Sequence, residues 1–194
     1  MTTFRITFFV ITSSRTMATF QRRDAHELLR TSLHEAGHVV AAHMLGIDVS
    51  RAPIATSNNA LGSCRMFTPF WALAGFPDER HKQLVENYLV VACAGWGAEM
   101  IIYGDAEQDA SADDMRMFRE TLMDSPVALV QRRNRKHVDL FLQSFQERRC
   151  VAAAELLEPH QGLLYGVARL LMRKQAVDAA EIHALLDRML IEGE

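Results

Sequence analysis

Residues 34–38 read HEAGH, and their types and spacing could assemble a metal site with a proton acceptor beside it. Four residues are a little over one helical turn, so His34 and His38 would project from one face, close enough to share a cation. Glu35 follows the first histidine, which brings its carboxylate beside the metal without using a coordination position. The motif therefore predicts two metal ligands and one general base, the HExxH arrangement of zinc hydrolases.

The stretch from Asp24 to Gly46 has the signals of one amphipathic helix that carries this motif. Asp24 and Glu27 form a capping-box pattern, and Gly46 can take the left-handed conformation that ends a helix. Apolar residues recur at helical spacing and predict a buried stripe, made of Leu29, Leu33, Ala36, Val40 and Met44. Gly37, between the histidines, costs ~1 kcal/mol in a helix interior, which indicates close approach by another backbone or by substrate.

Zinc sites usually have three protein ligands, so a further carboxylate or histidine must come from elsewhere in the chain. The best local candidate is the run DASADD at 109–114. Ser111 with Asp114 three residues later predicts a helix start, and Asp113 then lies in the first turn, where the helix dipole favours an ionised carboxylate. Asp109 and Asp114 are the alternatives within the run.

A long helix is predicted from Pro77 to about Tyr103, where Gly104 stops it. Its small and apolar residues suggest that it packs against the helix of the HEAGH motif. Glu99 lies near its end and has three interpretations: a metal ligand, a hydrogen-bond partner of a ligating histidine, or a surface carboxylate.

Composition favours one globular domain and excludes some classes of partner. The chain has 194 residues, 49% of them hydrophobic, which is enough for a sizeable core. A net charge of −3 argues against nucleic acid as the main partner. The three cysteines, Cys64, Cys93 and Cys150, form no CxxC pair, which fits reduced thiols in the cytoplasm. The sequence contains no run of ~20 apolar residues, the length that a membrane-spanning helix needs.

The expected fold is mainly α, with a small β-hairpin and a carboxy-terminal helical bundle. The hairpin would pair 48–54 with 60–67 across a polar turn. The apolar run 6–11 is interpreted as either an edge strand or a disordered arm. We expect three parts: an amino-terminal arm (1–23), a zinc-binding catalytic part (24–124) and the carboxy-terminal helices of the same domain (125–194).

Four landmarks together resemble the peptidase domain of the FtsH family of AAA zinc proteases: HEAGH at 34–38, ALG at 60–62, AGWGAEMIIYG at 94–104 and ASADD at 110–114. The similarity covers about residues 25–190. Carried over by position, it implies His34, His38 and Asp113 as zinc ligands and Glu35 as the base. The chain departs from the family at Ala112, where asparagine is usual, and in a loop about two residues shorter.

The resemblance implies a zinc metallopeptidase that cleaves unfolded chains or peptides with a metal-activated water. No GxxxxGK[ST] motif occurs in the sequence, so an AAA ATPase would have to act in trans. The family's peptidase domains form rings, which allows a homo-oligomer. The alternative is a zinc-stabilised scaffold or adaptor that docks on an AAA protease or another protein; retention of Glu35 favours the enzyme.

Overall fold

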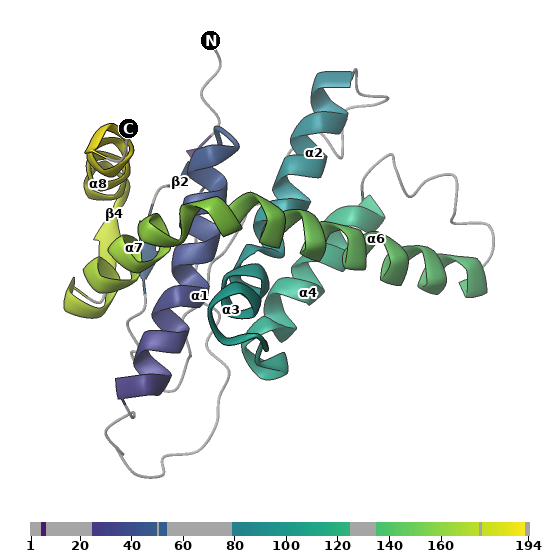
Figure 1. The fold of residues 1–194 in the computed structure, drawn as a ribbon. Coiled ribbons are helices and arrows are strands. Elements are labelled where there is room, and N and C mark those ends of the chain that lie inside the picture. Colours follow the sequence, from purple (N-terminus) through teal and green to yellow (C-terminus); the bar gives the residue numbers. More distant parts are fainter. Residues whose placement is uncertain are drawn as a thin grey trace.

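The structure is a computed structural model, and it describes residues 5–6, 25–49, 51–53, 79–124, 135–174 and 176–192. It is mainly α, as the sequence predicts (Figure 1). The helices are α1 (Ala25–Met44), α2 (Glu79–Ala92), α3 (Ala94–Tyr103), α4 (Gln108–Asp124), α6 (Arg135–Leu157), the 3-10 turn η2 (Glu158–His160), α7 (Gln161–Lys174) and α8 (Ala179–Glu192). The short strands are β1 (Arg5–Ile6), β2 (Asp48–Val49), β3 (Arg51–Pro53) and β4 (Ala176–Asp178).

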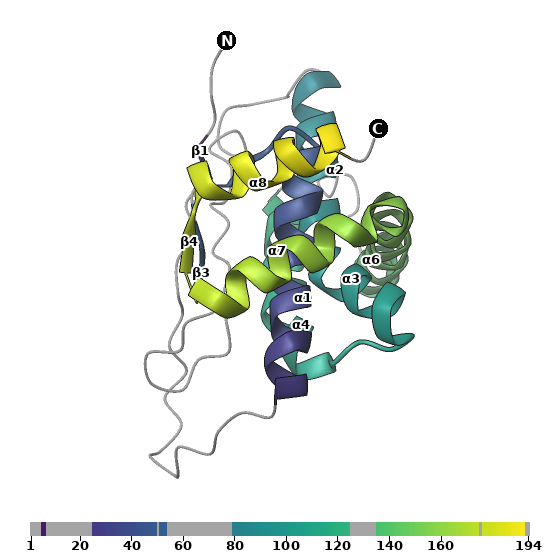
Figure 2. The same cartoon turned by 60° about the vertical axis from the view of Figure 1, so that its left-hand side comes forward.

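Helix α1 lies at the centre, packed against α3 on one side and α7 on the other (Figure 2). It ends as predicted: Gly46 has a φ of 66°, and the Ile47 amide donates to the carbonyl of Ala42. Gly37 lies against α3, where a Cβ would overlap the carbonyl oxygen of Ala94. The expectation that this glycine permits close approach of another backbone is confirmed.

The single long helix predicted from Pro77 to Tyr103 is wrong in one respect. The chain forms two helices, α2 and α3, which meet at Cys93 with a bend of 47°. The amide of Cys93 donates to Val90, one residue nearer than in an α-helix, so the regular ladder is interrupted there. The predicted stop is confirmed, because Gly104 has a φ of 76° and its amide donates to Met100.

The strands join parts of the chain that are far apart in sequence. Strand β1 pairs in parallel with β2, and β3 pairs antiparallel with β4 (Figure 2). Segment 48–54 therefore contributes strands, but its observed partners are 5–6 and 176–178. The predicted second arm of the hairpin, 60–67, lies outside the described residues.

The carboxy-terminal part is helical, as expected. Pro159 lies in the 3-10 turn that separates α6 from α7, and the Asp178 carboxylate accepts a hydrogen bond from the Glu181 amide at the start of α8. Helix α6 crosses α1, α2 and α3, and α7 covers α1 (Figure 1). These helices therefore form a layer that holds the elements of the HEAGH region together.

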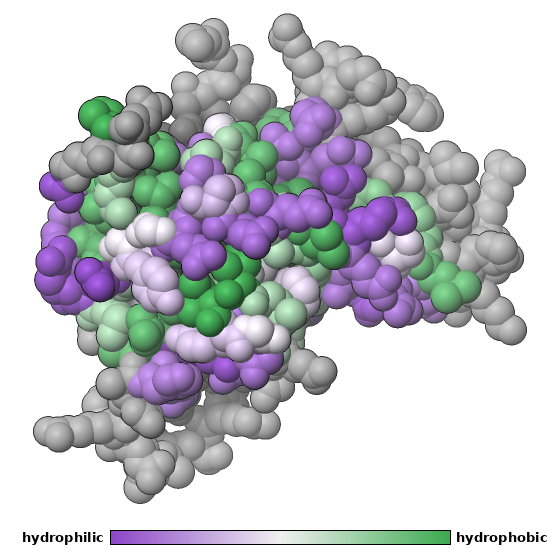
Figure 3. Space-filling model, in the orientation of Figure 1, coloured by the Kyte–Doolittle hydropathy of each residue, from purple (hydrophilic) through white to green (hydrophobic). Residues whose placement is uncertain are grey.

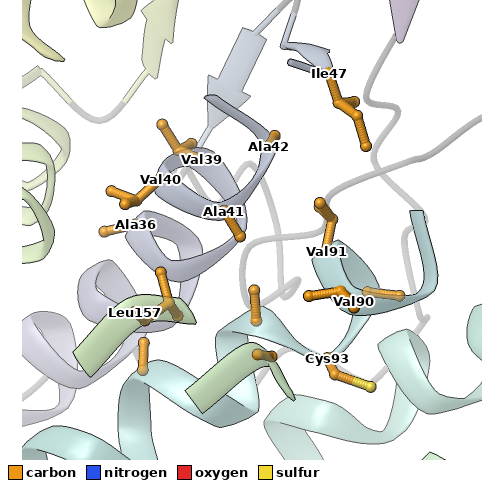
Figure 4. Packing of buried hydrophobic residues seen from close by; sticks show 14 of the residues in the cluster. Ala36, Val39, Val40, Ala41, Ala42, Ile47, Val90, Val91, Cys93 and Leu157 are labelled. Carbon is orange, nitrogen blue, oxygen red and sulfur yellow. The ribbon is translucent and has the colours of Figure 1, made fainter. Parts of the chain in front are cut away.

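The core runs along α1 and the α2–α3 junction. Figure 4 shows Ala36, Val39, Val40, Ala41 and Ala42 of α1 beside Val90, Val91 and Cys93. Small side chains on α1 let its backbone approach its neighbours closely, so the positions of the motif side chains are set by tight packing. On the face shown in Figure 3, hydrophilic residues predominate, with smaller hydrophobic areas between them.

Among the described helices, none has by itself the length and apolar content needed to cross a membrane; α2 and α3 meet the criteria only as a bent pair.

Candidate metal centre

The two motif histidines converge on one carboxylate oxygen. The Nε2 atoms of His34 and His38 lie 2.8 and 3.2 Å from Oδ2 of Asp114, and the rings are edge-to-face with centroids 5.1 Å apart. One ligand atom from each of the three residues lies within 4.8 Å of the others. All three side chains are buried. The spacing on α1 therefore does what the motif predicts, and α4 supplies the carboxylate.

The aspartate beside the histidines is Asp114, which replaces Asp113 of the sequence interpretation. The side chain of Asp113 is 64% exposed and pairs with Arg116 at 3.4 Å. The difference arises because α4 begins at Gln108, so Ser111 lies inside the helix and does not cap it. Consecutive residues on a helix are about 100° apart, so only one of the two aspartates can face α1.

A signal for Asp114 was present in the sequence. Residues 111, 114, 118, 121 and 122 are buried and follow helical spacing, with Phe118 and Leu122 as the apolar members. Asp114 belongs to that stripe, and Asp113 does not. The side chain of Asp109, the other alternative, lies outside the described residues.

Each histidine has a partner on its other ring nitrogen. Nδ1 of His34 is 2.7 Å from Oε1 of Glu99, and Nδ1 of His38 is 2.7 Å from the carbonyl oxygen of Val91. A carbonyl can only accept, so Nδ1 of His38 donates to Val91, and Nε2 is the ring nitrogen left for a metal. Of the three interpretations of Glu99, the structure supports the hydrogen-bond partner of a histidine.

The bend between α2 and α3 explains the acceptor for His38. In an unbroken helix the carbonyl of Val91 would accept from the amide of residue 95. The interruption at Cys93 leaves this carbonyl directed at His38. Sequence reasoning missed this contact because it predicted one continuous helix.

Gly95 allows α3 to approach the site. A Cβ at this position would overlap the imidazole of His34, with its atoms Cδ2 and Cε1 at 2.5 and 2.6 Å. The ring of His34 therefore lies directly on the backbone of α3. This contact leaves the imidazole little freedom to rotate away from Glu99 and Asp114.

The charges of the site stabilise one another. Burial opposes the charged form of His34, but its hydrogen bonds with Asp114 and Glu99 prevail and raise its pKa to about 10. Burial also opposes ionisation of Asp114, but the two histidines hold its pKa well below the usual range. The protein alone thus holds an ionised carboxylate between two imidazoles, an arrangement suited to a cation.

Glu35 differs from the other groups. It is buried beside His34, His38 and Asp114, and its Oε2 has no hydrogen-bond partner within the described part of the chain. Burial raises the pKa of its carboxyl group. A buried carboxylate oxygen without a partner is uncommon in proteins, and it marks this group for a role with a ligand or a water.

The donor set fits zinc. Around tetrahedral zinc with bonds of 2.0–2.1 Å, donor atoms lie about 3.3 Å apart. The separations of 2.8 and 3.2 Å are close to this value, and His, His and carboxylate are frequent zinc ligands. Three protein donors leave a fourth position for a water or a substrate, which distinguishes a catalytic arrangement from a closed structural one.

The chain is similar in sequence to an ATP-dependent zinc metalloprotease FtsH of Acidimicrobium ferrooxidans. The two are 27% identical over an alignment 205 residues long, and the alignment covers 86% of this chain and 30% of the relative. The chain thus spans less than a third of the relative's length, and the similarity indicates a distant relationship to FtsH. No family model matches the chain.

Proposed function

We propose that this chain is a zinc-dependent endopeptidase that hydrolyses peptide bonds in unfolded chains or peptides. One observation carries the proposal: a buried His34, His38 and Asp114 group lies beside Glu35, whose Oε2 has no hydrogen-bond partner within the described residues. The distant similarity to a zinc metalloprotease supports the same chemistry. The oxygen of a water would attack the carbonyl carbon, the C–N bond would break, and a carboxylate and an amine would result.

The residues of the chain have separate tasks in this reaction. His34, His38 and Asp114 would hold the ion. Zinc, when bound, lowers the pKa of a coordinated water to ≈ 7 and polarises the scissile carbonyl. Glu35 takes the proton from the water and passes it to the leaving amine. Its raised pKa suits a group that must both accept and release a proton.

We propose that the substrates are polypeptides that are already unfolded or that an AAA ATPase delivers in trans, because the distant relative is an ATP-dependent protease. We propose a cytoplasmic location, because the three cysteines form no CxxC pair. We propose a homo-oligomer, because the peptidase domains of the FtsH family form rings. Light scattering of the purified chain would measure the number of subunits.

The decisive experiment compares Glu35→Gln with wild type, both loaded with zinc, on a reduced and alkylated polypeptide. We expect cleavage to fall by about 10²–10⁴-fold in the variant while the zinc content stays the same, because the general base is lost and the ligands remain. Glu155→Gln, on the exposed surface of α6, is the matched control and should cleave normally. The proposal fails if wild type with stoichiometric zinc cleaves nothing.

A second candidate is a zinc-stabilised scaffold or adaptor. The burial of all three ligands favours it, because structural zinc sites are closed to solvent. In that case zinc would raise the melting temperature of wild type and Glu35→Gln alike, without turnover by either. The buried Oε2 of Glu35, which has no hydrogen-bond partner within the described residues, favours the enzyme, since a scaffold has no use for that carboxylate.

A further inference from the structure

Arg30 lies one turn before His34 on α1 and contacts the residue that holds this histidine. Its Nε donates to Oε2 of Glu99 at 2.7 Å, and the opposite oxygen of Glu99 is the one 2.7 Å from Nδ1 of His34. Arg30, Glu99 and His34 therefore form a chain of charge-assisted hydrogen bonds that ends on a proposed metal ligand. The side chain of Arg30 is only 13% exposed.

The same guanidinium also contacts the loop between α3 and α4. Its Nη2 donates to Oδ1 of Asp105 at 2.7 Å, and its Nε lies 3.4 Å from Oε1 of Glu107. The amide of Glu107 in turn donates to Oε2 of Glu99 at 2.9 Å. Arg30 thus joins α1, the end of α3 and the loop that leads into α4, the helix of Asp114.

Stacking restricts the guanidinium further. The carbon Cζ of Arg30 lies 5.0 Å from the centre of the Tyr103 ring, within the range of a cation–π contact. A planar group held on a ring, with donors in a rigid fork, can serve two carboxylates in fixed directions, which lysine cannot do.

The electrostatic need for Arg30 comes from the burial of Glu99, which is 1% exposed. Burial opposes a charge on this carboxyl group, and the hydrogen bonds from Arg30, the ring of His34 and the Glu107 amide offset that cost. Removing the cation would leave a buried negative charge with one strong donor fewer, close to the carboxylates of Asp105 and Glu107. A weakened Glu99 would orient His34 less firmly.

We propose that Arg30 is a positioning residue for the metal centre: it fixes Glu99 and the loop 104–107, and through them the ring of His34 and the approach of α4. The inference rests on the proposed function, because it assumes that His34 binds a metal. Within the described residues, the hydrogen bonds of Arg30 lead to His34 only through Glu99. The effect of Arg30 must therefore be visible in metal binding, independently of turnover.

The test measures the affinity of the purified full chain for Zn²⁺ by competition with a chromophoric chelator, and the visible absorption of the Co²⁺ form. Loss of an outer partner of a metal ligand typically costs 10–100-fold in affinity. We expect Glu99→Gln to fall in that range and Arg30→Gln to weaken binding by about 10-fold, with altered Co²⁺ absorption in both.

A double variant separates positioning from general damage to the fold. If Arg30 acts through Glu99, Arg30→Gln should add little to the loss already caused by Glu99→Gln, because the two residues belong to one chain of contacts. Arg148→Gln is the control: Arg148 also lies over an aromatic ring, that of Phe145, but on the exposed surface of α6. It should bind zinc as wild type does.

The outcomes are distinct. Wild-type affinity in Arg30→Gln, or losses that simply multiply in the double variant, would overturn the role of Arg30 while leaving the metal site intact. Failure of wild type itself to bind zinc would overturn the proposed function together with this inference. Should Arg30→Gln not fold, Arg30→Lys decides alone: intermediate affinity supports the proposal, and wild-type affinity overturns it.

Discussion

Helix α1 contributes to two pairs of histidines that use the same residue types in different ways. Near its middle, His34 and His38 direct their Nε2 atoms at one buried oxygen of Asp114. Near its end, His43 faces His183 of α8 with Nδ1 to Nδ1 at 3.4 Å, and Asp187 lies 3.7 Å from Nε2 of His43. Both places hold two imidazoles and one aspartate.

The surroundings separate the two places. The pKa of His34 is raised because two carboxylates outweigh burial, whereas burial lowers the pKa of His43 and Asp187 opposes it only in part. The side chain of Asp187 is 65% exposed and lies on the opposite nitrogen of His43 from His183. Within the described residues, three ligand atoms gather only at the first pair. Residue types alone do not bring three ligand atoms together; the directions of the ring nitrogens and the carboxylate decide it.

The largest expected effect tests this difference directly. His38→Ala should abolish stoichiometric zinc binding, because it removes one of three donors, and His183→Ala should leave one zinc per chain. Metal analysis after dialysis at neutral pH measures both. Loss of zinc in the His183 variant would show that the two pairs had been assigned in the wrong order.

The neighbouring aspartates sharpen the comparison at the same site. Asp114→Asn should weaken zinc binding by more than about 100-fold, beyond the usual cost of losing an outer partner, because a ligand charge is removed. Asp113→Asn should stay within about twofold, since its carboxylate faces solvent and Arg116. Equal losses in a chelator competition would contradict the orientation of α4.

Gly37 within α1 and Gly46 just after its end extend the comparison to stability. Gly37→Ala should destabilise the fold by about 3 kcal/mol, because the new methyl group meets the backbone of Ala94 and cannot be accommodated by a side-chain movement. Gly46→Ala should cost about 1 kcal/mol, since the site is open and only the positive φ is strained. Denaturant unfolding of the metal-free proteins gives both values, and a reversed order would contradict the close packing of α1 on α3.

The smallest effect concerns pH. The pKa of His43 is lowered in the folded chain, so its contribution to stability is present above the ordinary value of 6.5 and is lost as the pH falls. Replacing it by glutamine should therefore reduce the drop in melting temperature between pH 7 and pH 5. The metal site is common to both proteins, and its contribution cancels. An unchanged drop would show that the burial of His43 carries no such penalty.

Local patterns of the sequence predicted several features correctly. HEAGH placed His34 and His38 on one face because helical spacing brings them there whatever surrounds the helix, and it placed Glu35 next to His34 in the chain. The ends at Gly46 and Gly104 were predictable for the same reason, since a positive φ is a local property of glycine. The mainly α fold followed from similar periodic patterns.

Contacts between distant parts of the chain were not predictable in this way. The buried face of α4 decided between Asp113 and Asp114, which lie about 100° apart around the helix. The bend at Cys93 decided that the Val91 carbonyl holds His38.

The sequence by itself determined which residues of α1 could bind a metal and act as the base, because their arrangement depends only on the geometry of one helix. The tertiary structure alone decided the carboxylate from α4, the acceptors on Glu99 and Val91, and the contact of Arg30 with the α3–α4 loop. These depend on how separate helices pack, and the free energy of that packing is spread over the whole core.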